Sequence, residues 1–218
     1  MPKGFTEHEK ELIRKRLLEQ GYKLFSAYGL KKTNVEEIAQ AAGISKGAFY
    51  NFYESKETLF MDVIEQAEIR LRREVLAVID LPGPSPRARL FAVLKKAFAL
   101  FETIPILQFL TGIDYDLLFR RVPAEKLQEH LASDRAFFEE LMTRCRNAGI
   151  PIQAKPEQII GSLYPLVLTI LHKEDLYRID YRGNIDLLLE LVAAFWLGEV
   201  EIQLQEPIRI APDKEEGS

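Results

Sequence analysis

The chain has 218 residues, of which 47% are hydrophobic and 28% are charged, as in an ordinary folded globular protein. This composition excludes wholesale disorder and fibrous or collagen-like architectures, and the length allows one large domain or two modest ones. The formal net charge of −4 does not by itself favour a nucleic-acid-binding protein.

The distribution of charge along the chain is uneven. Residues 1–56 carry 10 Lys/Arg against 7 Asp/Glu, whereas residues 57–218 carry 19 against 26. A basic N-terminal segment on an acidic body is the asymmetry expected when one part of a protein meets phosphates.

The sequence indicates a cytoplasmic protein without a membrane partner. Its one cysteine, Cys145, cannot form an intrachain disulfide, which favours a reducing compartment. The first residues are charged where a signal peptide needs an apolar run. The longest mostly apolar stretch, residues 159–171, is too short to cross a bilayer.

The first predicted helix starts with a capping box formed by Thr6 and Glu9. Its apolar residues share one face until Gly29 stops it. A second capping box, Thr33 with Glu36, predicts a short helix that runs to residue 42.

Two serines cap the helices that follow. Ser45 opens a short helix to about residue 53, and Ser55 opens a long helix to about residue 80. The long helix has an apolar stripe at helical spacing, and the proline-rich run 81–86 ends it.

Helical periodicity continues beyond this break. Ser85 and Pro86 have the character of an N-cap and a first helical residue, and Asn184 is the expected cap of the last helix. We predict helices at about 87–101, 104–119, 123–147, 156–173 and 184–198, and a mobile tail over 206–218. No strand pattern is convincing, so the predicted fold class is all-α.

Residues 34–53 have the spacing of a helix-turn-helix motif. Two short helices would meet at Gly43, because glycine allows the positive φ of a sharp turn. Ile38, Ile44 and Phe49, with Phe52 or Tyr53, would supply the apolar contacts between them. The positions left exposed have small, polar or cationic side chains, which suit a helix that enters the major groove.

The segments GLKKTNVEEIA, AGISKGAFY and ESKETL resemble the DNA-binding domain of the TetR family of bacterial transcriptional regulators, over roughly residues 10–65. The resemblance implies a three-helix DNA-binding domain over 1–55. A long helix would join it to a helical ligand-binding and dimerisation domain over 56–205.

The resemblance also implies which residues contact DNA. Four of them, Thr33, Asn34, Tyr50 and Lys56, would bind phosphates. The others would approach base edges, except that Asn51 would contact a base or make no contact. Tyr50 could alternatively be a packing residue. The expected DNA contacts are Thr33, Asn34, Ser45, Lys46, Gly47, Ala48, Tyr50, Asn51 and Lys56.

The last two predicted helices are apolar around almost their whole circumference, so every side of them must be covered. A peripheral C-terminal pair lacks enough partners within one chain, which predicts a two-fold four-helix dimer interface. The alternative is a pair of central helices in a monomer. The expected interface residues are Ile160, Leu163, Val167, Leu188, Val192, Phe195 and Trp196.

A small organic effector is expected in an apolar cavity between the C-terminal helices. Each candidate lining residue could equally be ordinary core. The candidates are Phe98, Phe101, Phe109, Tyr115, Phe119, Phe138, Met142, Tyr164 and Leu168.

Together these features predict a dimeric, sequence-specific transcriptional regulator, a repressor released from palindromic double-stranded DNA by a small ligand. One alternative is a constitutive DNA-binding protein without an effector, which would lack a ligand-sized cavity. The other is an enzyme with an accessory helix-turn-helix. We expect no enzyme activity, metal or cofactor, because the sequence shows no nucleophile–base pattern and its three histidines lie far apart.

Overall fold

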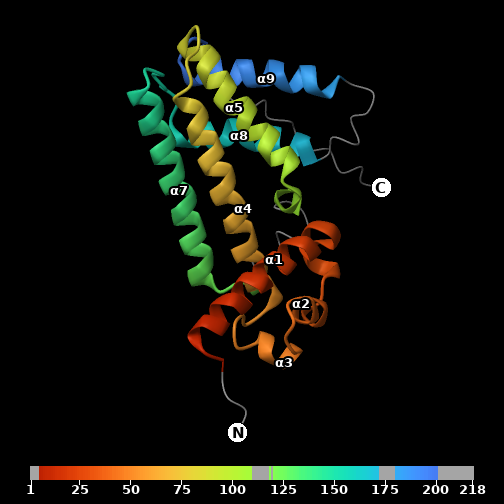
Figure 1. The fold of residues 1–218 in the computed structure, drawn as a ribbon. Helices are drawn as coiled ribbons and strands as arrows, with labels where there is room; N and C mark the ends of the chain where they lie inside the picture. Colours follow the sequence, from red (N-terminus) through yellow and green to blue (C-terminus); the bar gives the residue numbers. More distant parts are fainter. Residues whose placement is uncertain (1–4, 110–117, 119, 172–179, 201–218) are drawn as a thin grey trace, which may run out of the picture.

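The computed structural model describes residues 5–109, 118, 120–171 and 180–200. Helices make up most of this part of the chain, and no strand occurs in it. Figure 1 shows three N-terminal helices at one end of the molecule and a second helical group at the other, with α4 running between them. The predicted all-α fold is confirmed.

The N-terminal helix α1 (Glu7–Lys32) begins with the predicted capping box. The Glu9 N–H donates to the Thr6 hydroxyl (3.3 Å), and the Thr6 N–H donates to the Glu9 carboxylate (2.7 Å). Gly29 does not end the helix. It kinks it, because its φ of 74° lies in the left-handed region, and a last helical turn follows.

Two short helices, α2 (Val35–Ala41) and α3 (Lys46–Phe49), form the predicted helix-turn-helix. The predicted cap of α2 is wrong by one residue. Asn34 caps the helix by accepting a hydrogen bond from the Glu37 N–H (2.9 Å), because the Thr33 side chain turns inward toward α1. The helix α3 is also shorter than predicted, because turns follow residue 49 instead of further helix.

The long helix α4 (Lys56–Ile79) matches its prediction closely. Ser55 caps it by accepting from the Thr58 N–H (3.1 Å). Its apolar stripe is buried against α1 at one end and against α5 further along. The helix therefore belongs to the packing of both helical groups in Figure 1.

The second group contains α5 (Pro86–Thr103), the 3₁₀ helix η1 (Pro105–Phe109), α7 (Ala124–Asn147), α8 (Pro156–Leu171) and α9 (Tyr181–Trp196). Ser85 and Pro86 act as the predicted cap and first residue of α5. In Figure 1, α8 and α9 lie across the ends of α4, α5 and α7 that are remote from α3.

Two C-terminal predictions need correction. The α-helix predicted over 104–119 is replaced at its start by η1, where Pro105 has no N–H to give, and most of the remainder lies outside the described residues. The last helix starts at Tyr181, because Asp180, not Asn184, caps it through the Gly183 N–H (3.2 Å). The predicted tail 206–218 also lies outside the described residues.

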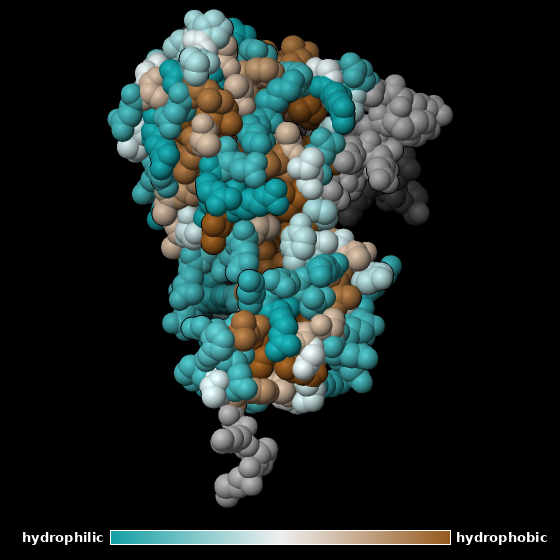
Figure 2. Space-filling view, viewed as in Figure 1, coloured by the Kyte–Doolittle hydropathy of each residue, from teal (hydrophilic) through white to brown (hydrophobic). Residues whose placement is uncertain are grey.

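The face drawn in Figure 2 is mainly hydrophilic, with hydrophobic side chains in small separate patches. Among the described helices, none is both long enough and apolar enough to span a membrane.

Candidate nucleic-acid interface and ligand cavity

The turn between α2 and α3 is fixed by glycine and by backbone hydrogen bonds. Gly43 has a φ of 75°, and the next amide, that of Ile44, donates to the Ala39 carbonyl (2.9 Å). Ile38 and Phe49 are fully buried between the helices. These contacts hold the start of α3 at a set angle to α2, as a recognition helix requires.

Most residues predicted to contact DNA lie on the outer face of this motif. Ala48 is half-buried, and a side chain at position 47 would meet open space. The Tyr50 side chain is 52% exposed, although one side of its ring packs edge-on against Phe49 at 5.5 Å between centroids. The exposed members of the set are Asn34, Ser45, Lys46, Gly47, Tyr50 and Asn51.

Ser45 already has a structural task. Its hydroxyl accepts a hydrogen bond from the Ala48 N–H (3.1 Å), which caps α3. The hydroxyl hydrogen and the exposed side of the residue remain available to a base or a phosphate.

Thr33 and Lys56 do not occupy the positions expected of phosphate ligands. Thr33 is fully buried, and its hydroxyl donates to the Gly29 carbonyl (2.8 Å). The Lys56 ammonium donates to the carbonyls of Leu30 and Thr33, both at 2.7 Å. In this conformation both side chains brace the kinked end of α1, and their phosphate contacts stay predictions.

A residue that the sequence did not single out borders the same face. Arg121, which precedes α7, lines a groove with Asn34 and Tyr50, and its guanidinium lies 3.4 Å from the Glu57 carboxylate. No sequence signal could have found Arg121, because it lies 64 residues beyond its partner in the chain.

The second helical group encloses a cavity of about 200 Å³ between α4, α5, α7, α8 and α9. Its lining is aliphatic and aromatic apart from the Cys145 thiol, whose pKa burial raises to about 11. Three predicted residues, Phe98, Phe101 and Phe138, line it. Leu163, Val167 and Trp196, which the sequence predicts at the dimer interface, also line it. The remaining lining residues have no sequence signal beyond ordinary core periodicity.

The other predicted cavity residues are not part of the lining. Phe109 and Met142 pack against the core elsewhere, and Leu168 is half-buried outside the cavity. Tyr164 is 59% exposed because it lies on the outer side of α8. Tyr115 and Phe119 lie outside the described residues.

Comparison with known proteins agrees with this arrangement. Residues 17–63, which contain α2, α3 and parts of α1 and α4, match the sequence profile of the family described as bacterial regulatory proteins, tetR family. This N-terminal segment therefore resembles the DNA-binding part of TetR-family regulators. The resemblance noted in the sequence is therefore confirmed.

One curated relative is YuxN of Bacillus subtilis (strain 168), named as an uncharacterized HTH-type transcriptional regulator. The two are 38% identical over 96 residues, which is 44% of this chain and 31% of YuxN. The chain thus aligns with about a third of that relative's length.

Two solved structures share the fold over most of the chain. The fatty acid degradation regulator FadR from Bacillus halodurans has a TM-score of 0.60 at 14% identity, covering 88% of this chain and 97% of FadR. FadR from Bacillus subtilis, solved in complex with stearoyl-CoA, has a TM-score of 0.58 at 17% identity, covering 83% and 97%. At these identities the likeness shows the fold alone.

The outer face of α8 and α9 is apolar. Of the predicted interface residues, Ile160 and Leu188 are exposed, while Leu163, Val167, Val192 and Phe195 are half-buried. The same face exposes Tyr164, Leu187 and Leu191.

Trp196 is wrongly predicted as an interface residue. It is 1% exposed, lines the cavity of its own chain and donates its indole N–H to the Ser162 hydroxyl (3.0 Å). The all-round apolar character of α9 therefore has two causes, an inner side that faces the cavity and an outer side that faces away from the chain.

A polar cluster joins α4 to α7. Glu68, His130 and Asp134 have potential ligand atoms within 4.8 Å of one another, but Arg72 forms ion pairs with both carboxylates. A guanidinium in this position fills the role that a metal ion would have, so the cluster is an interhelical ion-pair network. Burial, reinforced by the Asp134 charge, raises the pKa of Glu68 to about 8.

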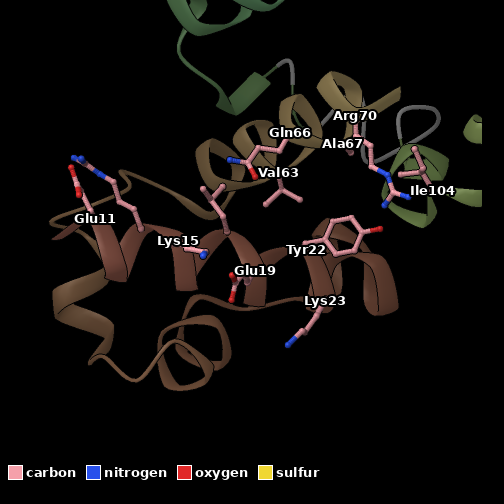
Figure 3. A pocket seen from close by; sticks show the side chains of 12 residues that line it. Glu11, Lys15, Glu19, Tyr22, Lys23, Val63, Gln66, Ala67, Arg70 and Ile104 are labelled. Carbon is pink, nitrogen blue, oxygen red and sulfur yellow. The ribbon is translucent and has the colours of Figure 1, made fainter. Parts of the chain in front are cut away.

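A wide groove of about 980 Å³ separates α1 from α4 (Figure 3). Its floor contains the buried side chains of Val63 and Ala67. The α1 side carries Glu and Lys alternating at every fourth position, from residue 11 to residue 23, and Lys23 points away from α4 in Figure 3. These four side chains can pair with one another along α1, and Arg14 and Arg70 also line the groove.

Proposed function

We propose that this protein is a TetR-family transcriptional regulator, a homodimeric repressor that binds a palindromic operator and leaves it when a small apolar ligand binds. The observation that carries the DNA half is the exposed face of α3. Lys46 and Gly47 are exposed at the start of α3, which Gly43 and Ser45 hold in place, and Tyr50 is exposed at its end. A protein with this task would work in the cytoplasm.

The proposal that the protein is a homodimer rests on the outer face of α8 and α9. Ile160, Tyr164, Leu187 and Leu191 are each more than half exposed in the single chain. Large apolar side chains gathered on one surface favour association, and a two-fold pairing of these helices would cover them. Two recognition helices would then meet two half-sites of a palindrome.

The proposal that the protein binds a small apolar ligand rests on the cavity. A cavity that excludes polar groups favours the hydrocarbon part of a molecule, and any charged part would have to remain outside it. The fold neighbour from Bacillus subtilis was solved with stearoyl-CoA, a molecule with such a hydrocarbon part. The cavity also favours an effector-responsive protein over a constitutive DNA-binding protein.

The decisive experiment uses duplex DNA enriched from a random pool by the protein. Replacing Lys46 by Ala or Tyr50 by Phe should weaken binding by about 1–3 kcal/mol, because each removes a DNA contact without disturbing the buried core. Lys23→Ala is the matched control, since it removes an exposed charge from α1. Unchanged affinity in both test variants, measured by fluorescence anisotropy, would remove the proposed reading face.

Ligand binding is tested separately by thermal shift with a homologous series of n-alkyl alcohols. We expect the melting temperature to rise with chain length and then fall once the chain outgrows the cavity. Ala97→Leu, which narrows the cavity, should shorten the optimal chain, whereas Ala132→Leu on the exposed side of α7 should not. The same optimum in both variants would contradict binding at this cavity.

A further inference from the structure

A second groove, of about 690 Å³, lies beside the proposed DNA face. Asn34, Lys46 and Tyr50 line it from the helix-turn-helix, and Glu57 and Arg121 line it from the other side. Four residues expected to meet DNA, these three and Lys56, therefore share a concavity with one arginine from outside the motif. If DNA binds here, its backbone passes along this groove.

The lysines at the groove differ in how available they are. The Lys56 ammonium is bonded to the carbonyls of Leu30 and Thr33, whereas Lys46 is exposed and lies 3.9 Å from the Glu36 carboxylate. The buried Thr33 hydroxyl, like the Lys56 ammonium, is unavailable. Glu37 and Glu54 also line the groove, so a phosphate near it needs a compensating positive charge.

Arg121 can supply that charge. Its side chain is 61% exposed, whereas that of Glu57 is only 4% exposed. A guanidinium has five N–H donors in a rigid fork, so one edge can pair with Glu57 while the others face the groove. The buried carboxylate thus holds the arginine in place without using up its donors.

We propose that Arg121 binds a DNA phosphate from outside the helix-turn-helix and that Glu57 positions it. This inference rests on the proposed DNA-binding function. It adds a contact made by a residue just before α7, and α7 lines the cavity. A shift of α7 relative to α4 would then weaken DNA binding directly, in addition to any change in the angle of α4.

The test uses a 30-base-pair duplex enriched from a random pool, with its dissociation constant measured by anisotropy over a series of potassium chloride concentrations. Arg121→Gln should weaken binding about fivefold or more at low salt and reduce the slope of log affinity against log salt by about 0.9, because one phosphate contact is lost. Arg120→Gln removes the same charge from the exposed neighbour and should change neither value appreciably.

Glu57→Gln separates positioning from simple electrostatics. Removing a negative charge near DNA should tighten binding if Glu57 merely repels phosphates, whereas our inference requires weaker binding and a smaller salt slope. The Glu57→Gln/Arg121→Gln double variant leaves no buried unpaired charge, so it tests the lost contact in a protein with a neutral pair. It should keep the low salt slope of Arg121→Gln.

Equal effects of Arg121→Gln and Arg120→Gln would overturn the phosphate contact, and tighter binding by Glu57→Gln would overturn the positioning role. If Lys46→Ala still weakens binding in that case, the proposed function stands and only this inference fails. If no duplex is enriched by the wild-type protein, both fail.

Discussion

Lys56 shows how one side chain near the DNA face can serve the fold instead. Its ammonium donates to carbonyls of Leu30 and Thr33, which follow the Gly29 kink and have no helical partner. We therefore expect Lys56→Met to lower the free energy of unfolding by about 1–3 kcal/mol, since buried acceptors lose a charged donor.

Urea unfolding measures this change, with Lys31→Met on the exposed end of α1 as the control. The salt slope of DNA binding should stay near that of the wild type. A stable Lys56→Met variant whose salt slope falls would instead restore Lys56 as a phosphate ligand.

Glu68 gives a prediction about pH at the same scale. Its folded pKa of about 8 lies above the ordinary value of 4.5, because burial and the Asp134 charge disfavour the carboxylate. The folded state therefore takes up a proton between these two values, and the contribution of Glu68 to stability falls as pH rises through this window.

Glu68→Gln should remove this part of the pH dependence. The free energy of unfolding of the variant minus that of the wild type should become more positive from pH 5 to pH 9, because only the wild type loses the contribution of Glu68 over this range. Arg72 keeps Asp134 as a partner in the variant, so the interhelical contact survives. A difference between the two proteins that stays constant over this range would show that Glu68 does not titrate in it.

At the scale of the element, the outer side of α8 and α9 carries the dimer prediction. Leu188 is 39% exposed in the single chain, so Leu188→Arg should be tolerated within one protomer. In the proposed dimer the same arginine would be buried opposite apolar side chains at a cost of several kcal/mol. We expect the variant to sediment as a folded monomer.

Leu12→Arg is the matched control, because Leu12 is a similarly exposed leucine on α1. It should remain a dimer. Dimers in both variants at micromolar concentration would place the two-fold axis on another face.

The boundaries of most elements could be predicted because their signals are local. Thr6 with Glu9, Ser55 and the Ser85–Pro86 pair act within one helical turn, and the apolar stripe of α4 repeats along a single helix. The failures have a different origin. The inward turn of Thr33 depends on the kinked end of α1, which no local pattern describes.

The candidate sites were less predictable for the same reason. Lys56 and Arg121 find partners 23 and 64 residues away, so their roles depend on how α1, α4 and the segment before α7 approach one another. For Trp196, apolar periodicity shows that all sides of α9 are covered but not whether its own chain or a second copy covers them.

At the scale of the whole molecule, α4 packs against α1 of the N-terminal group at one end and borders the cavity at the other. Ligand binding and DNA binding should therefore favour different orientations of α4. Each should weaken the other by the same coupling free energy of about 1–3 kcal/mol. Calorimetry of the best alkyl alcohol, with and without the enriched duplex, should show weaker ligand binding to the DNA complex. Equal affinities would mean that the cavity does not control DNA binding.

The stoichiometry and sequence of the enriched complex test the central claim most directly. The wild-type protein should select an inverted repeat from a random pool, with half-sites separated by about one helical turn or a little more. Analytical ultracentrifugation of the purified complex should then give two chains for each duplex that carries both half-sites, and Lys46→Ala should weaken the enrichment. Failure to enrich any sequence over the starting pool, or a single chain on each selected duplex, would contradict a dimeric operator-binding regulator.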